Sequence, residues 1–251
     1  MPSSLLCLGI KDYRNRAECN SYSNIYFMKY MKAIIFDLAG VILNLNLERD
    51  TRALNDVGLP DFAGCLADDA IRIPMLAYLN GLSDVETFCH DLRPKCRPDV
   101  TDAEMLWAMD AVLDDIPRSR IEMLLSLRKN YRVYLLSNIY DAAWKHAVKE
   151  IERHGVSVSD CFDYTFLSHE MQLAKPDPKI FQTVIDATGI NPEETYYFDD
   201  TKENIDMGAK LGFHSILVPM NQLESVIDIL ECVRPRTYIV LLIHMWHIYT
   251  Y

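Results

Sequence analysis

Short runs of apolar residues alternate along the chain with longer segments in which apolar residues recur at helical spacing. The short runs are continuously apolar, as in parallel strands that are buried on both faces. They predict five strands, over residues 33–37, 132–137, 164–167, 195–199 and 215–218. Amphipathic segments over 178–188 and 202–211 lie between the last three of these strands. The alternation predicts an α/β fold built on a parallel sheet.

A long stretch without a strand pattern separates the first two predicted strands. It predicts four helices, over 48–57, 65–79, 85–92 and 103–113, and its punctuating residues are Pro60, Pro74, Gly81, Pro94 and Pro98. A further helix over about 118–129 returns the chain to the sheet. We therefore predict a three-layer, Rossmann-like core domain over 31–47 and 116–232, with an all-helical cap domain inserted over 48–115.

The two ends of the chain do not follow this pattern. Residues 1–30 show no clear periodicity, and Met28 and Met31 stand just before the first strand. We interpret this segment as an N-terminal extension, either disordered or produced by a misassigned start. The apolar tail over 233–251 has an uncharged run of about fourteen residues from Tyr238, whereas a membrane span needs roughly twenty. The sequence leaves the role of this tail open.

Charge and cysteine content narrow the classes of partner. The formal net charge is −11, and no cluster of lysine and arginine is long enough to form a basic face. We therefore expect no nucleic-acid partner and, given the short apolar runs, no membrane partner. The seven cysteines are scattered, without a CxxC pair. This spacing predicts reduced thiols and a cytoplasmic protein.

Polar residues stand where the predicted strands end. In an open parallel sheet these carboxyl ends meet at one edge, where ligands bind. The first strand is followed by Asp37 and the second ends at Ser137 and Asn138. Asp199 and Asp200 follow the apolar part of the fourth, with Asn204 one helical turn beyond, and a Lys175-Pro176-Asp177 step precedes that strand.

This set of residues indicates a particular chemistry. Three aspartates close together repel one another unless a cation lies among them. Oxygen ligands of this kind suit Mg²⁺. A magnesium ion, a lysine and a hydroxyl group suit a phosphoryl group, whose spread charge needs several positive partners. A carboxylate beside them can attack phosphorus as a nucleophile.

With these motifs in this order, the chain resembles the haloacid dehalogenase (HAD) superfamily. The resemblance covers about 31–232 and is to the phosphatase branch, in which a helical cap follows the first motif. Its carrying motifs are Phe36-Asp37-Leu38-Ala39-Gly40-Val41, Leu136-Ser137-Asn138, Lys175-Pro176-Asp177 and Phe198-Asp199-Asp200 with Asn204. The segment Ser168-His169-Glu170-Met171 is also similar to bacterial phosphatases of the α-D-glucose-1-phosphate phosphatase type.

The resemblance implies a role for each residue of the metal site. Asp37 is implied to attack phosphorus and to become an aspartyl-phosphate. The carboxylates of Asp37 and Asp200 and the carbonyl oxygen of Ala39 are implied to bind Mg²⁺. Asp199 and Asn204 are implied to orient these ligands and their waters.

The remaining implied roles concern the substrate. Ser137 and the backbone of Asn138 are implied to hold phosphate oxygens, and Lys175 to neutralise the nucleophile and the transferring group. The helical cap is implied to select the substrate and to exclude water. The expected activity is therefore Mg²⁺-dependent hydrolysis of a small phosphorylated metabolite, such as a sugar phosphate.

The chain departs from the family pattern at Ala39, where most of these phosphatases have an aspartate that protonates the leaving oxygen. General acid–base catalysis is typically worth about 10²–10⁴-fold. Asn44 and Asn46 are neutral and offer no obvious replacement, and nothing in the sequence selects among His169, Glu170 and a residue of the cap as the proton donor. We expect a slow phosphatase. The alternatives are a catalytically weak phosphate-binding or regulatory protein and, on the same fold, a metal-independent dehalogenase.

Overall fold

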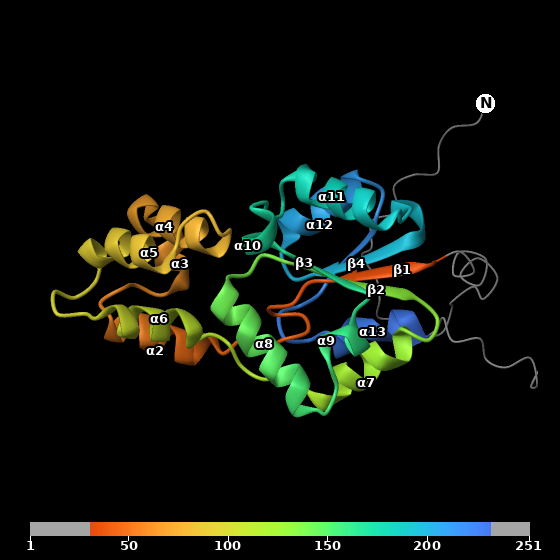
Figure 1. Cartoon of the computed structure of the whole chain (residues 1–251), viewed down its shortest axis with the longest axis horizontal. Coiled ribbons are helices and arrows are strands. Elements are labelled where there is room, and N and C mark those ends of the chain that lie inside the picture. Colours follow the sequence, from red (N-terminus) through yellow and green to blue (C-terminus); the bar gives the residue numbers. More distant parts are fainter. Residues whose placement is uncertain (1–30, 232–251) are drawn as a thin grey trace, which may run out of the picture. The chain divides into compact units, whose positions relative to one another are not determined.

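The computed structural model describes residues 31–231, so our expectations for residues 1–30 and 233–251 lie outside the described residues. Five parallel strands form one sheet in the order β3-β2-β1-β4-β5 (Figure 1). They are β1 (Ala33–Phe36), β2 (Arg132–Ser137), β3 (Tyr164–Leu167), β4 (Thr195–Asp199) and β5 (His214–Leu217). The parallel sheet is confirmed, and each strand lies within one residue of its predicted bounds.

The register of the central strand brings three strand ends together. Phe36, the last residue of β1, pairs with Leu135 of β2 on one side and with Phe198 of β4 on the other. Asp37 follows, and its backbone N–H donates to the carbonyl oxygen of Phe198 at 2.8 Å. Asp37, directly after the central strand β1, therefore lies at the edge of the sheet where β2 and β4 also end. The chain connections run from β1 to both sides of the sheet, and ligands bind at such a point.

Helices cover both faces of the sheet, which gives three layers (Figure 1). Alternate residues of a strand point to opposite faces. Ile34 and Phe36 belong to an apolar cluster that also includes residues of α7 (Arg118–Leu127), α8 (Asp141–Arg153) and α13 (Glu224–Glu231). Ala33 and Ile35 belong to a second cluster, with residues of α11 (Pro178–Thr188) and α12 (Lys202–Lys210).

The described segment between β1 and α7 contains helices and no strand, as predicted. These are α2 (Leu47–Asp56), α3 (Phe62–Ala67), α4 (Asp69–Leu79), α5 (Val85–Leu92), the 3₁₀ helix η1 (Arg93–Lys95) and α6 (Asp102–Asp110). The later short elements are α9 (Val158–Cys161), α10 (Ser168–Met171) and the 3₁₀ helix η2 (Pro192–Glu194). No helix within residues 31–231 has the length and apolar character needed to cross a membrane.

The predicted helix over 65–79 is wrong, because the structure has two helices there, α3 and α4. They are separated at Asp68, whose carboxylate accepts a hydrogen bond from the backbone N–H of Ala70 at 2.9 Å and caps α4. Such a cap satisfies a backbone donor that the helix leaves free. Pro74 lies inside α4 and does not end a helix. The helix predicted over 103–113 ends earlier, at Asp110.

A narrow neck joins the inserted helices to the core. Leu45 and Leu113 form an antiparallel bridge. Beside it, the backbone N–H of Asn44 donates to the carbonyl oxygen of Asp115 at 2.9 Å, and that of Asp114 donates to Asn44 at 3.0 Å. The chain therefore leaves the core and returns to it at adjacent positions.

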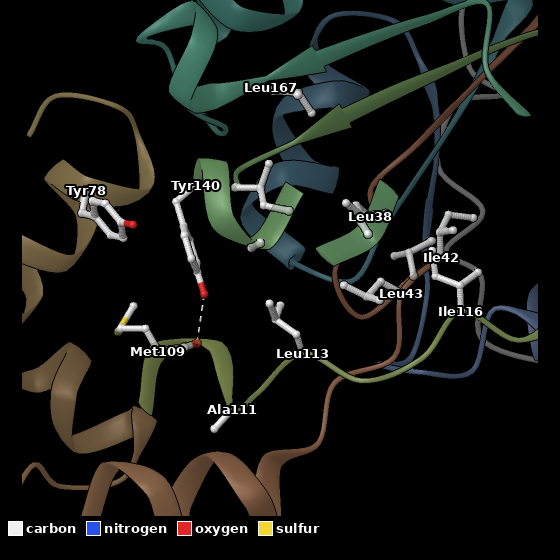
Figure 2. Packing of buried hydrophobic residues seen from close by; sticks show 14 of the residues in the cluster. Leu38, Ile42, Leu43, Tyr78, Met109, Ala111, Leu113, Ile116, Tyr140 and Leu167 are labelled. Atoms are coloured by element: carbon white, nitrogen blue, oxygen red, sulfur yellow. Dashed lines mark hydrogen bonds between the residues drawn. The ribbon is translucent and has the colours of Figure 1, made fainter. Parts of the chain in front are cut away.

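Tyr140, just after β2, contacts the inserted helices at a second place (Figure 2). Its ring lies beside that of Tyr78 in α4, with centroids 5.2 Å apart. Its hydroxyl oxygen is 3.0 Å from the carbonyl oxygen of Met109 and 2.7 Å from a carboxylate oxygen of Asp110. Since Tyr140 is buried, these contacts couple α4 and α6 to the loop that follows Asn138.

Candidate active site

Asp37 is a buried carboxylate at the sheet edge, with 7 % of its surface exposed. One of its oxygens, Oδ1, lies 2.8 Å from Nζ of Lys175. Burial raises the pKa of Asp37 to about 7, and Asp199 and Asp200 add to this increase, whereas Lys175 opposes it. Without a further cation, the site therefore favours the neutral form of Asp37 more strongly than water does.

Lys175 is buried between two carboxylates. Its ammonium group donates to Asp37, to Asp199 at 2.7 Å and to the carbonyl oxygen of Leu136 at 2.8 Å. These acceptors use all three N–H groups of a lysine. Burial alone would lower the pKa of Lys175, but the charges of Asp199 and Asp37 outweigh burial and raise it. Lys175 therefore stays positively charged next to Asp37.

The side chain of Asn138 holds the backbone of Lys175 in place. Its Oδ1 accepts from the Lys175 N–H at 2.9 Å, and its Nδ2 donates to the Lys175 carbonyl oxygen at 2.8 Å. The sequence predicted a substrate contact for the backbone of Asn138 and missed this second role of its side chain. Paired amide contacts of this kind fix a segment in both position and direction.

Asp199 is fully buried and accepts hydrogen bonds from four groups. Oδ2 accepts from Lys175 at 2.7 Å and from the hydroxyl of Tyr197 at 2.5 Å. Oδ1 accepts from the backbone N–H of Thr201 at 2.8 Å, and Nδ2 of Asn204 lies 3.0 and 3.2 Å from the two oxygens. Because these donors engage both oxygens, Asp199 acts as an anchor for its neighbours.

Asp37, Asp199 and Asp200 form a cluster in which one oxygen from each lies within 4.8 Å of the others. Burial, followed by the charge of Asp199, raises the pKa of Asp200. Three carboxylates face one lysine, so the site has an excess of negative charge that a divalent cation would balance. Oxygen donors in this arrangement fit Mg²⁺. Since the oxygens of Asp199 are already engaged, Asp37 and Asp200 are the carboxylates open to an ion.

The turn after β1 packs directly against Asp200. Gly40 has a φ of +79°, and a Cβ atom added there would lie 2.3 Å from Oδ2 of Asp200. A side chain at position 40 would therefore collide with the carboxylate. Ala39, the preceding residue, is half-buried in the same turn.

Ser137 has an unpartnered hydroxyl at the end of β2. Its Oγ is buried and forms no hydrogen bond within residues 31–231. A buried hydroxyl normally finds a partner. Ser137 follows Leu136, whose carbonyl oxygen binds Lys175, so an anion held near Lys175 would supply an acceptor for it. This orphaned group fits the predicted phosphate contact.

The structure also places the residues considered as proton donors. Nδ1 of His169 is 2.7 Å from the carbonyl oxygen of Ile139, and Glu170 is exposed. Asn44 contacts Asp115 and Asn46 caps α2. The two asparagines therefore have structural partners, and no contact directs His169 or Glu170 to the carboxylate cluster among the described residues.

Two residues that the sequence analysis missed clamp the turn after β1. Asn221, with a φ of +61°, donates its backbone N–H to Gly40 at 2.7 Å, and its side chain pairs with the N–H and the carbonyl oxygen of Leu45, both at 2.8 Å. Arg120 is buried and donates to the carbonyl oxygen of Ile42 at 3.2 Å. No motif marks either residue, because their partners are mostly backbone atoms far away in the sequence.

The parallel sheet, with a lysine and three carboxylates at its edge, has the fold and the charged groups of the haloacid dehalogenase class. Over residues 31–212 the chain matches the haloacid dehalogenase-like hydrolases, and it belongs to this family. The family confirms the resemblance inferred from the motifs and makes the protein a hydrolase, and its relatives fit the phosphatase branch.

Similar proteins from bacteria cover most of the chain. A D-ribitol-5-phosphate phosphatase of Bacteroides thetaiotaomicron is 30% identical over 187 residues, which cover 74% of this chain and 90% of the relative. A crystal structure of a HAD family enzyme from the same organism, in complex with magnesium and inorganic phosphate, is 33% identical with a TM-score of 0.67 and covers 76% of this chain and 95% of that one. A predicted HAD-like hydrolase of Porphyromonas gingivalis is 28% identical with a TM-score of 0.72 and covers 82% and 100%.

Proposed function

We propose that the protein is a Mg²⁺-dependent phosphatase that hydrolyses a small phosphorylated sugar or polyol through an aspartyl-phosphate on Asp37. The observation that carries this proposal is the position of Lys175, which bridges Asp37 and Asp199 at 2.8 and 2.7 Å. It gives a buried carboxylate a fixed positive neighbour at the edge of the sheet where the unpartnered hydroxyl of Ser137 also lies. A nucleophile, a cation and a free donor are what phosphoryl transfer requires.

The metal in this proposal is Mg²⁺, because a related enzyme binds magnesium and phosphate together. Asp37, Asp200 and the carbonyl oxygen of Ala39 would hold it, and it would supply positive charge to the transferring phosphoryl group. The structure supports this role for Asp37 and Asp200 through the excess negative charge of their cluster.

The protein residues then account for bond making and breaking. A carboxylate oxygen of Asp37 bonds to phosphorus while the bond from phosphorus to the leaving oxygen breaks, and that oxygen takes up a proton from solvent water. Water then attacks the phosphorus of the aspartyl-phosphate, releasing inorganic phosphate and restoring Asp37. Lys175 stays within reach of Asp37 throughout, and Ser137 donates to a phosphate oxygen.

Ala39 makes this phosphatase slow on poor leaving groups. A methyl group carries no proton, so the step that a general acid would assist loses about 10²–10⁴-fold. Aryl phosphates leave as weakly basic oxygens and depend less on a proton donor. We therefore expect faster turnover of an aryl phosphate than of a pentitol phosphate such as D-ribitol 5-phosphate, the substrate named for a relative.

Steady-state kinetics with Mg²⁺ test the proposal. Wild type should hydrolyse the aryl phosphate, Asp37→Asn should lose turnover while keeping its circular dichroism, and Ala39→Asp should gain at least tenfold on the polyol phosphate. Wild-type preference for the polyol phosphate together with no gain in Ala39→Asp would contradict the assignment of Ala39. Halide release from a haloacid in EDTA, without phosphate release from either ester, would instead favour a dehalogenase, which needs no metal.

A phosphate-binding or regulatory protein is the second candidate, and Ala39 is the observation that favours it. Such a protein would bind a phosphosugar with Mg²⁺ but would release no phosphate in the same assay. For location we propose the reducing cytoplasm, since the described Cys65, Cys89, Cys96 and Cys161 are free thiols. The proposal includes neither a nucleic-acid nor a membrane partner.

A further inference from the structure

Tyr197 points a hydroxyl group into the centre of the site, although no motif includes it. It lies in β4 two residues before Asp199, so the two side chains emerge on the same face of the strand. Its hydroxyl donates to Oδ2 of Asp199 at 2.5 Å, and Tyr197 is fully buried. Burial, followed by Asp199 and Asp37, raises the pKa of Tyr197 well above its usual value, which keeps the hydroxyl protonated.

Packing explains the ring of Tyr197 but not its hydroxyl. The ring packs edge-on against Phe181, with centroids 5.4 Å apart, and lies 6.3 Å from Phe213. Phenylalanine would make the same contacts and would avoid burying a polar group, which costs free energy unless a hydrogen bond offsets it. The hydroxyl is therefore explained by its acceptor, Asp199.

The acceptor links Tyr197 to the proposed nucleophile. Oδ2 of Asp199 also receives Lys175, and the same ammonium group contacts Asp37. A donor on Oδ2 shares the negative charge of Asp199, which leaves more of the lysine charge to Asp37. Without this donor, Asp199 attracts Lys175 more strongly, and the ion pair between Lys175 and Asp37 weakens.

We infer that Tyr197 is a positioning residue: through Asp199 it fixes where Lys175 stands against the nucleophile Asp37. The inference rests on the proposed phosphatase function. Because the contacts of Tyr197 are with Asp199 and with aromatic rings, its hydroxyl should matter more for the transition state than for substrate binding.

Tyr197→Phe compared with Tyr134→Phe tests the inference. Tyr134 is buried in the same apolar cluster, and its hydroxyl forms no hydrogen bond in the described part of the chain. Tyr197→Phe should lower kcat for the aryl phosphate about tenfold with little change in KM, whereas Tyr134→Phe should change neither. Unchanged kcat in a folded Tyr197→Phe would overturn the inference.

Binding of orthovanadate with Mg²⁺, measured by calorimetry, gives a readout independent of turnover. Vanadate mimics the pentacoordinate phosphoryl group, so its dissociation constant should rise about tenfold in Tyr197→Phe, while that of inorganic phosphate stays the same. If wild type binds vanadate but turns over no phosphate ester, the phosphatase proposal fails and the vanadate comparison still decides the role of Tyr197. Equal vanadate affinity in the two proteins would reject that role.

A double-mutant cycle with Asn204→Ala separates action through Asp199 from simple packing. Asn204 is another donor to Asp199. If Tyr197 acts through this carboxylate, the two variants should be non-additive in kcat by at least threefold, while Tyr134→Phe and Asn204→Ala should be additive. Additive effects of Tyr197→Phe and Asn204→Ala on kcat would contradict the inference. A general loss of packing produces no specific coupling, so this test also applies when the variants are less stable than wild type.

Discussion

Asp37 and Asp199 are buried carboxylates that share one lysine, yet their surroundings differ. Four groups donate to Asp199, whereas the Asp37 side chain has an ion pair with Lys175. Burial and the nearby aspartates raise the pKa of Asp37 to about 7. Asp199 is therefore suited to hold its neighbours still, while Asp37 keeps lone pairs for an ion or for phosphorus.

Magnesium affinity should depend on pH through Asp37. Its carboxyl group is largely neutral at pH 6 and ionised at pH 8, and Mg²⁺ binds the ionised form, so binding should release a proton. We expect the dissociation constant of Mg²⁺ to fall about tenfold from pH 6 to pH 8, as measured by calorimetry. Asp37→Asn is the control and should lose most of this dependence. Equal affinity of wild type at both pH values would contradict the prediction.

At the scale of elements, the strands were predictable and some helices were not. The central strand β1 is a continuous apolar run in which every residue is buried, Ile34-Ile35-Phe36 included, whereas the edge strands β3 and β5 are partly exposed. The break at Asp68 was missed because a capping aspartate resembles any polar residue of an amphipathic helix. The helix α8 was not predicted, since two of its three buried residues are the alanines Ala143 and Ala147. At such places the helix propensity of the residues and their burial in the core give different indications, so the sequence alone does not mark the helix.

The turn after β1 depends on Asn221, and this dependence is testable. Asn221→Gly keeps the left-handed backbone but removes both side-chain hydrogen bonds to Leu45. It should lower the free energy of unfolding by about 1–3 kcal/mol in urea. Gln172→Gly, at another non-glycine position with positive φ (53°), is the control for glycine flexibility, and it loses one exposed side-chain hydrogen bond, to the carbonyl oxygen of Gly81 at 3.2 Å. An equal loss in both variants would show that the clamp contributes nothing.

At the scale of the molecule, the motifs predicted which residues meet but not what orients them. Strand ends of a parallel sheet share an edge, so Asp37, Ser137 and Asp199 were expected together from their order alone. The roles of Arg120 and Asn221 depend on contacts between distant segments and on backbone acceptors. These carry no residue pattern, and only the folded chain reveals them.

Tyr140 should control how firmly the inserted helices hold to the core. Tyr140→Phe keeps the ring beside Tyr78 but removes the hydroxyl from Met109 and Asp110 (Figure 2). Losing a buried hydrogen bond to a charged group costs about 1.5–3 kcal/mol. Amide hydrogen exchange within Asp102–Asp110 should therefore speed up by about 10- to 150-fold. Tyr131, which packs against the same apolar cluster, provides the control variant Tyr131→Phe. Similar exchange in both variants would contradict the prediction.

The neck between Leu45 and Leu113 has a consequence for protein engineering. The backbone hydrogen bonds of Asn44 join the outgoing and returning segments directly, so the two ends of the inserted helices are already next to each other. A foreign helical module whose ends are equally close could join the core at these positions, but the contacts of Tyr140 with Tyr78 and Asp110 would have to be rebuilt. The inserted helices are therefore a segment that can be exchanged as a unit between relatives, provided that the incoming module also packs against Tyr140.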